Sequence, residues 1–166
     1  MTAEVLGSLR SVNGKGAVRI ESRLSAEINE VWSALTDPSR LARWLGDFEG
    51  GLHPNSSYRC RYFSSGAEVT GRVELCDPPR RFTVANKGLH APNEQLIEAT
   101  LTADGNETIL LITQHNLRLD WLPAFGAGLQ IHLEDLAAHL ANASRCDSDT
   151  RMSQLVPLYE ALPIDN

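Results

Sequence analysis

The sequence contains few cysteines, and their spacing argues against two kinds of stabilising site. Cys60, Cys76 and Cys146 are odd in number and far apart, and no two of them form a CxxC pair. Disulfide frameworks and structural zinc sites normally show paired, closely spaced cysteines. The three thiols are therefore expected to be free, as in the reducing cytoplasm, where disulfides are rare.

Long apolar runs and basic clusters are also missing. No stretch of about 18 apolar residues would form a transmembrane helix, and residues 1–10 lack the basic start and apolar core of a secretory signal. Acidic residues outnumber basic ones by 21 to 15, for a net charge of −6. Neither nucleic-acid binding nor membrane insertion is therefore expected. The chain has 166 residues, of which 42% are hydrophobic. This length and composition are typical of one globular domain.

Recognisable catalytic and cofactor motifs are missing as well. The chain has no GxSxG pattern to hold a nucleophile beside its base. Gly50-Gly51 lies between predicted strands and does not open a helix, as a phosphate-binding loop would. Cys60 lies on an inward face of a predicted strand, where cysteine is more often a small hydrophobic residue than a nucleophile. The sequence therefore identifies no catalytic residue and no cofactor, and it leaves enzymatic activity open.

Hydrophobic periodicity predicts the first secondary-structure elements. Residues 1–16 contain three glycines and little periodicity, so they are predicted to be a loose lead-in. Strict alternation over residues 18–24 predicts a strand with one buried face. Apolar residues at helical spacing over 28–35 predict an amphipathic helix. Asp37-Pro38 predicts the cap and first residue of a second, shorter helix.

The rest of the chain is predicted to be a sheet followed by a long helix. A helix is expected from 121 to 143, then a polar linker at 144–150 and a short amphipathic tail. This order predicts an α+β domain, in which a curved antiparallel sheet of six to seven strands wraps around the long helix. An apolar cavity for a small molecule is expected between them. The further strands are expected in short alternating segments, at 58–62, 69–75, 82–84, 95–101 and 108–114.

Four segments resemble the Bet v 1-like (START-like) superfamily, and within it the bacterial proteins named after the activator of the heat-shock protein ninety ATPase. They read RIESRLSAEINEVWSALTDPSRLARWL, GRVELCDPPRRFTV, NEQLIEATLTADGNETILLITQHNL and GLQIHLEDLAAHL, in the family's order. The resemblance covers residues 17–143 and implies a helix-grip fold with a hydrophobic cavity. This fold hosts lipid and polyketide binders, aromatase/cyclases, hydrolase-like enzymes and chaperone regulators, so it does not select one function.

Two positions depart from the family's pattern. Family members often carry an aromatic residue where this chain has Ala85-Asn86, and tryptophan where it has Leu129. Both positions are expected to bear on the cavity or its rim. The family's choice of ligand is therefore not carried over to this chain.

Three potential metal ligands, His132, Asp135 and His139, follow one edge of the predicted long helix. At about 1.5 Å of rise per residue, the two histidines are roughly 10 Å apart along the axis, too far for one ion to bind all three residues. No metal site is predicted, because a solvated helix flank or a cavity rim explains the three residues more simply. His132 lies nearest the apolar stripe, so a role in the cavity as hydrogen-bond partner or general base stays open.

The expected ligand-binding residues are those that strand alternation turns inward, together with the helix residues that face them. Four polar side chains, those of Tyr58, Tyr62, Gln114 and His132, are expected to orient the ligand. The complete expected set is Tyr58, Cys60, Tyr62, Val73, Val84, Ile97, Ala99, Leu110, Ile112, Gln114, Phe125, Leu129, His132 and Leu133.

Three functions follow from these observations. The leading hypothesis is a cytoplasmic protein that binds a small hydrophobic molecule in the cavity. The first alternative is a polyketide cyclase/aromatase-type enzyme, in which His132 would move protons. The second is an interaction protein resembling the chaperone-ATPase activator, which would use the sheet exterior and the tail. Residues 144–166 are expected to fold back on their own domain, with packing against a partner in a homodimer as the alternative.

Overall fold

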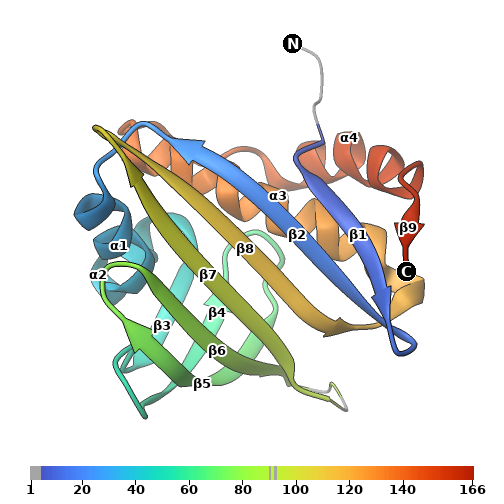
Figure 1. Cartoon of the computed structure of the whole chain (residues 1–166), viewed down its shortest axis with the longest axis horizontal. Coiled ribbons are helices and arrows are strands. Elements are labelled where there is room, and N and C mark those ends of the chain that lie inside the picture. Colours follow the sequence, from blue (N-terminus) through green and yellow to red (C-terminus); the bar gives the residue numbers. More distant parts are fainter. Residues whose placement is uncertain (1–4, 90, 92) are drawn as a thin grey trace.

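The computed structural model describes residues 5–89, 91 and 93–166. It has the predicted α+β architecture, with a strongly curved sheet and a long helix near the C-terminal end (Figure 1). The helices are α1 (Ile28–Thr36), α2 (Pro38–Trp44), the 3-10 turn η1 (Leu119–Trp121), α3 (Leu122–Leu140) and α4 (Ser148–Glu160). The strands are β1 (Gly7–Val12), β2 (Lys15–Leu24), β3 (Gly46–Gly50), β4 (Ser57–Tyr62), β5 (Glu68–Asp77), β6 (Arg81–Gly88), β7 (Gln95–Asp104), β8 (Glu107–Leu117) and β9 (Ile164–Asp165).

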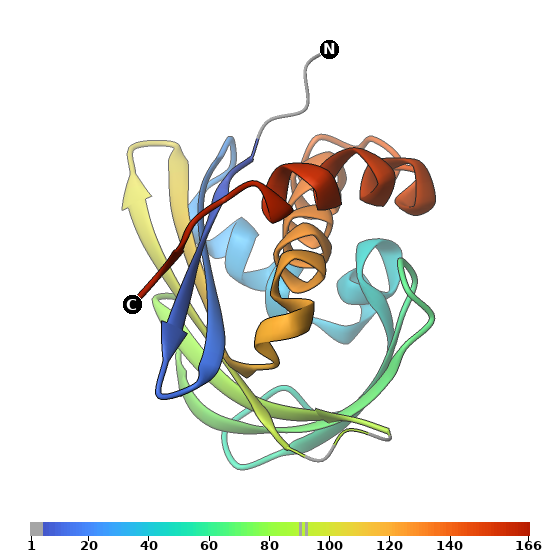
Figure 2. The ribbon, with the colours of Figure 1, turned by 90° about the vertical axis from the view of Figure 1, so that its right-hand side faces the viewer.

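The strands form one sheet in the order β3-β4-β5-β6-β7-β8-β2-β1-β9. Neighbours run antiparallel except for β1 and β9, which are parallel. The sheet wraps around α3, and α4 crosses α3 on the side that the sheet leaves open (Figure 2). This arrangement confirms the predicted helix-grip fold. The described residues form nine strands where six to seven were predicted, because β1, β3 and β9 were not expected.

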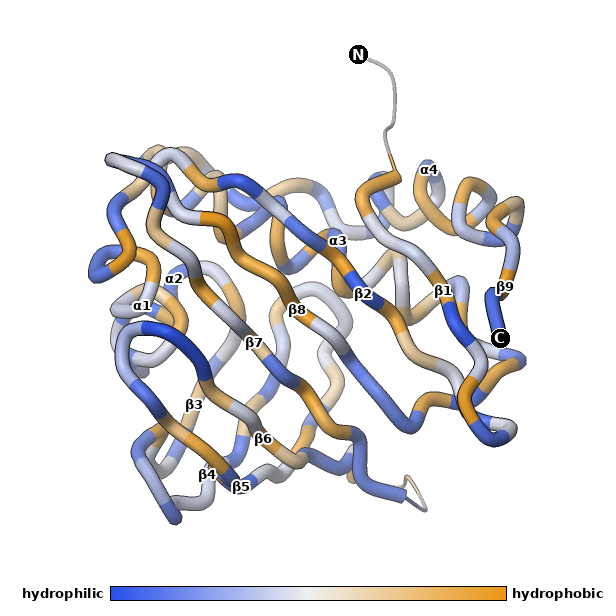
Figure 3. Tube along the Cα trace, viewed as in Figure 1, coloured by the Kyte–Doolittle hydropathy of each residue, from blue (hydrophilic) through white to orange (hydrophobic). Residues whose placement is uncertain are grey.

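Strand alternation places one face of the sheet against the helices. On β2, Val18, Ile20 and Leu24 are buried, while Arg19 and Glu21 between them are exposed. Figure 3 shows the corresponding change between hydrophobic and hydrophilic residues along β2 and β7. Because β2 lies between β8 and β1 in the sheet, its apolar face forms the centre of the core with the buried face of α3.

The first sixteen residues differ from the prediction. Residues 7–12 form β1, an ordered strand in which Leu9 is only 1% exposed. Asn13 (φ 52°) and Gly14 (φ 80°) make the two-residue turn from β1 to β2. Asn-Gly is a strong signal for such a hairpin, because both positions need positive φ. The lead-in prediction was therefore wrong for this segment, and residues 1–4 lie outside the described part of the chain.

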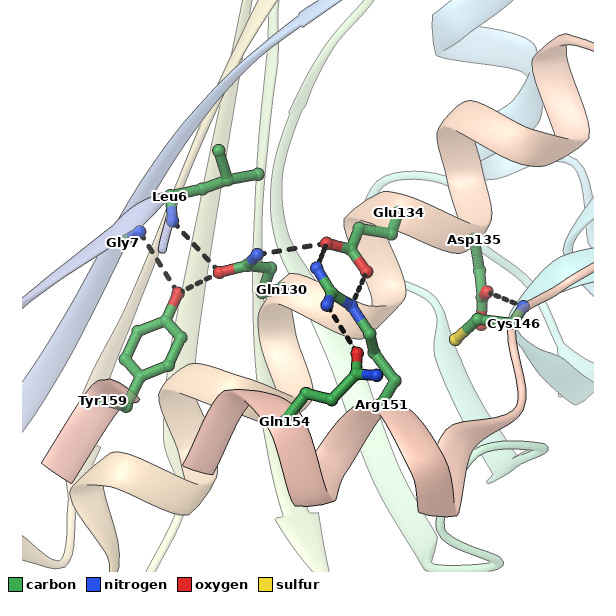
Figure 4. A network of polar contacts seen from close by, with 9 residues as sticks. All are labelled: Leu6, Gly7, Gln130, Glu134, Asp135, Cys146, Arg151, Gln154 and Tyr159. Atoms are coloured by element: carbon green, nitrogen blue, oxygen red, sulfur yellow. Dashed lines mark hydrogen bonds and ion pairs between the residues drawn. The ribbon is translucent and has the colours of Figure 1, made fainter. Parts of the chain in front are cut away.

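The tail folds back on its own domain through α4, which begins at Ser148, within the predicted linker. Tyr159 is fully buried against α3, where Gly126 allows the close approach: a Cβ there would lie 2.5 Å from Cδ1 of Tyr159. The Tyr159 hydroxyl donates to Oε1 of Gln130 (2.6 Å) and accepts from the Gly7 N–H (3.1 Å) (Figure 4). Arg151 adds a bidentate ion pair with Glu134, at 2.6 and 2.7 Å. These contacts link α4 to both α3 and β1.

Candidate ligand pocket

An apolar pocket of about 470 Å³ lies between the concave face of the sheet and α3. A smaller extension of about 110 Å³ continues from it towards α2 and β3. The five residues shared by both parts mark their junction: Tyr62, Asn86, Ile97, Leu129 and His132. Pockets of about 300–1,000 Å³ with mostly apolar walls and a few polar groups are typical small-molecule sites.

A second hollow, of about 530 Å³, lies over β3, β4 and β5 and has a more polar, exposed lining. Its lining includes Arg59, Arg72 and Glu94, which are exposed. Arg72 and Glu94 pair with each other at this surface, so their charges already have partners. The pocket beside α3 is therefore the stronger candidate, because it combines apolar walls with buried polar groups.

Ten of the fourteen residues expected to contact a ligand line the pocket or its extension. Strands β4, β6, β7 and β8 contribute six of them, and α3 contributes the other four. The ten are Tyr58, Tyr62, Val84, Ile97, Ile112, Gln114, Phe125, Leu129, His132 and Leu133.

The other four expected residues are buried but are not among those that line the pocket. Cys60 and Val73 pack with Tyr58 and Val84 in a small buried cluster on the inward face of the sheet. Ala99 and Leu110 belong to the main core, where α1 contacts β7 and β8. All four face inward as predicted, but neighbouring side chains and α1 fill the space in front of them. Alternation correctly predicted their burial and could not show what covers them.

His132 is the only member of the His132, Asp135 and His139 group among the residues that line the pocket. Its Nε2 lies 3.0 Å from the Ser64 Oγ, and its ring lies 5.0 Å, centroid to centroid, from that of Tyr62. Burial lowers the pKa of His132 to about 4, so the imidazole is neutral at pH 7. A neutral imidazole can accept a hydrogen bond on one nitrogen and donate one from the other.

The structure separates Asp135 and His139 from this site. Asp135 is 1% exposed, and its Oδ1 accepts a hydrogen bond from the Cys146 N–H at 2.9 Å. The solvated-flank interpretation is therefore wrong for Asp135, because the segment before α4 covers it. His139 lies beside Arg40, whose Nε donates to its Nε2 at 3.3 Å. Within the described residues no group of three potential ligands could hold a metal ion.

Asn86 is a central polar group of the pocket that the expected set omitted. It lies on β6, is 2% exposed, and lines both the pocket and its extension. Burial raises the pKa of Tyr58 to about 12 and also raises that of Tyr62, while a hydrogen bond from the Asn86 amide opposes both shifts. The signal in the sequence for this position is the departure of Ala85-Asn86 from the family's pattern.

The wider part of the pocket is bordered by groups from several elements. The Gln114 amide donates to Oε1 of Gln95 on β7 at 2.7 Å, so these two amides partner each other. Trp121 of η1 is 57% exposed, and Met152 of α4 completes the lining. At Gly128 an added Cβ would meet nothing within 4 Å, so this glycine leaves space open. Met152 was missed because the fold of the tail cannot be read from periodicity, and Gly128 because a glycine has no side chain for an apolar pattern to mark.

The site contains no strongly activated nucleophile in the part of the chain that the structure describes. Cys60 lies outside the pocket lining, and burial raises the pKa of its thiol to about 12, which suppresses the reactive thiolate. Ser64 has His132 as a neighbour, but the low pKa of that imidazole makes it a weak base at neutral pH. The arrangement suits binding of a largely apolar molecule with a few directed hydrogen bonds.

Comparisons with known proteins agree with the fold. The profile of the family described as "Activator of Hsp90 ATPase homolog 1-like protein" matches residues 25–141. The crystal structure of CalU16 from Micromonospora echinospora is similar, with a TM-score of 0.77 and 24% identity over 94% of each chain. DynU16, a protein in the dynemicin biosynthetic locus, has a TM-score of 0.71 and 27% identity, over 79% of this chain and 50% of its own. None of the curated proteins compared matches.

No described helix has the length and apolar character needed to cross a membrane.

Proposed function

The chain belongs to the Activator of Hsp90 ATPase homolog 1-like family, and we propose that it binds a small hydrophobic molecule in the pocket between the sheet and α3. The observation that carries this proposal is a pocket of about 470 Å³ with apolar walls and a few convergent polar groups. A ligand that buries about 250 Å² of apolar surface there would gain roughly 6 kcal/mol before the costs of association.

The likeness to DynU16 supports a small-molecule ligand, since that protein is in a locus that makes dynemicin. The proposal includes a cytoplasmic location, which is supported by three unpaired cysteines.

A polyketide cyclase-type enzyme is the second candidate, and the contact between Ser64 and His132 is what favours it. Proton transfer by His132 would need an imidazole that titrates near the working pH. Burial instead lowers its pKa to about 4. Binding without turnover is therefore the preferred proposal.

The interaction-protein alternative used the sheet exterior and the tail as its contact surfaces. Leu155 and Tyr159, the apolar residues that would have served a partner, are fully buried in the protein's own core. They are therefore occupied without a chaperone or a second copy of the chain. This packing removes these two residues from the contact surface, and it leaves the sheet exterior as the other surface that the alternative named.

A filled pocket is the direct test of ligand binding. Native mass spectrometry and solvent extraction first establish whether a molecule co-purifies, and titration with the neutral dye Nile red then measures the affinity. We expect Gly128→Phe to weaken dye binding at least tenfold, because the new ring extends into open pocket space. Ala137→Phe, which adds the same ring at an exposed position of α3, is the matched control. Equal affinity of both folded variants would place the dye elsewhere and contradict the proposal.

A further inference from the structure

We propose that the pocket selects an uncharged ligand whose polar end both donates and accepts hydrogen bonds, as a carboxamide or a lactam does, and that Gln95 and Gln114 bind that end. This inference rests on the proposed ligand binding and adds the chemical class of the ligand. Two independent features of the lining carry it: the absence of charged side chains among its described residues, and two neighbouring amides that share one hydrogen bond and leave the rest of their capacity unused.

The charge of the ligand follows from the residues around it. Among the described residues that line the pocket and its extension, none is Asp, Glu, Lys or Arg. His132 does not supply a positive charge at pH 7, because burial keeps its imidazole neutral. An ionised group that leaves water needs an opposite charge or several hydrogen bonds to offset the loss of hydration. A carboxylate or phosphate inside this pocket would find no counter-charge.

Gln95 and Gln114 reach the pocket from neighbouring strands. Gln114 on β8 lies opposite Ile97 of β7 in the sheet, and Gln95 precedes Ile97 by two residues, so all three side chains share the inward face. Both glutamines line the wide part of the pocket and are not among the described residues of the extension. Because Nε2 of Gln114 donates to Oε1 of Gln95 at 2.7 Å, each amide holds the other in position.

The shared bond leaves Oε1 of Gln114 and Nε2 of Gln95 without a side-chain or backbone partner among the described residues. Both atoms can be reached from solvent. In the described part of the chain the enclosed side-chain atoms without a partner are Asn86 Oδ1 and Asp135 Oδ2, and neither glutamine contributes one. An amide has an oxygen that accepts and a nitrogen that donates, so the pair offers one acceptor and one donor whichever glutamine donates in the shared bond.

A ligand group that both donates and accepts can satisfy this pair completely. A carboxamide donates to Oε1 of Gln114 and accepts from Nε2 of Gln95, whereas a ketone or an ester can only accept. The apolar skeleton then extends along Ile97 and Leu129, which line both the wide part of the pocket and its extension. Water on the two amides is the competing occupant, and in that case the pocket would rank ligands by apolar area alone.

Three probes with one ring system and polar groups of nearly the same shape separate these possibilities: 2-naphthamide, 2-acetylnaphthalene and 2-naphthoate. Each is titrated at neutral pH, and the affinity of each uncharged probe is divided by its water-to-hydrocarbon partition coefficient to remove the hydrophobic contribution. We expect the normalised affinity of 2-naphthamide to exceed that of 2-acetylnaphthalene at least tenfold, because the ketone cannot donate. We expect 2-naphthoate to bind at least a hundredfold more weakly than 2-naphthamide.

The variant Gln114→Met tests the assigned pair, because it keeps the length of the side chain and removes the amide. The ratio of the 2-naphthamide and 2-acetylnaphthalene affinities should fall about tenfold in this variant. Gln154→Met, the same substitution at an exposed position of α4, is the matched control and should leave the ratio unchanged. An unchanged ratio in folded Gln114→Met would overturn the assignment to this pair. The wild-type comparison stands by itself if the variant does not fold.

The outcomes separate the ligand class from ligand binding itself. Equal normalised affinities of the amide and the ketone, or tight binding of 2-naphthoate, would overturn the ligand class while ligand binding remains. Binding of Nile red together with failure of all three probes would have the same meaning. Failure of Nile red and of all three probes would overturn the proposed function together with the inference drawn from it.

Discussion

The neutral state of His132 makes the stability of the protein depend on pH. Burial lowers the pKa of His132 from 6.5 to about 4 on folding. Between these values the unfolded chain binds a proton that the folded chain does not, so stability falls as the pH falls from 6.5 towards 4. Above this range the full stability is present. A separation of about 2.5 pH units corresponds to at most about 3.4 kcal/mol, and to about 2.5 kcal/mol at about pH 4.5.

The measurement is urea unfolding, followed by circular dichroism, of the wild type and of His132→Gln. Glutamine keeps a hydrogen-bonding group beside Ser64 and does not titrate. Between about pH 7.5 and about pH 4.5, the wild type should lose about 2.5 kcal/mol more stability than the variant. His139, whose pKa is lowered by burial and by Arg40, is present in both proteins, so its contribution cancels.

An equal loss of stability in the two proteins would refute this reasoning. It would mean that the imidazole takes up its proton in the folded state as easily as in water, so that the site around it is well hydrated. The interpretation of the pocket as a site without a charged group would then be wrong, because a protonated His132 could pair with an anionic ligand.

Two further predictions concern how α4 is held on α3. Gly126→Ala should lower the free energy of unfolding by about 1–3 kcal/mol, because its Cβ would lie 2.5 Å from the Tyr159 ring. Gly128→Ala should raise the free energy of unfolding by about 0.4–1 kcal/mol, because the added Cβ meets nothing within 4 Å. Thermal unfolding of both variants measures this difference, and shifts of the same sign would contradict it. Tyr159→Phe should cost about 1–3 kcal/mol in urea unfolding, because the lost hydroxyl bridges Gln130 and the Gly7 N–H. The exposed Ser153→Ala serves as its control on the same helix, and an equal cost for both would show that the hydroxyl is dispensable.

The architecture could be predicted to a large extent because its signals are local. The alternation of Val18, Ile20 and Leu24 shows the buried face of β2 regardless of what packs against it. The Asp37 side chain accepts from the Ser39 N–H at 3.0 Å and caps α2 as its Asp-Pro pair predicted. The β1–β2 hairpin was also encoded locally, by Asn13-Gly14, and the prediction overlooked that signal.

The candidate site could be predicted only in part, because a pocket is defined by segments far apart in the chain. Leu110 and Ile112 face the same side of β8, but Ile112 lines the pocket extension whereas Leu110 is covered in the core. His132 faces Ser64, 68 residues earlier. Nothing in the spacing around either residue indicates that contact.

The sequence by itself determined most of the strands and helices, the α+β class, and which face of the strongly periodic elements turns inward, because these depend on periodicity over a few residues. The tertiary structure decided which inward residues border open space, and it buried Asp135 beneath the segment before α4. It also decided that the Asn86 oxygen has no partner among the described residues and that His132 is neutral. Hydration and hydrogen bonding of a side chain depend on every segment around it, and only the folded chain brings those segments together.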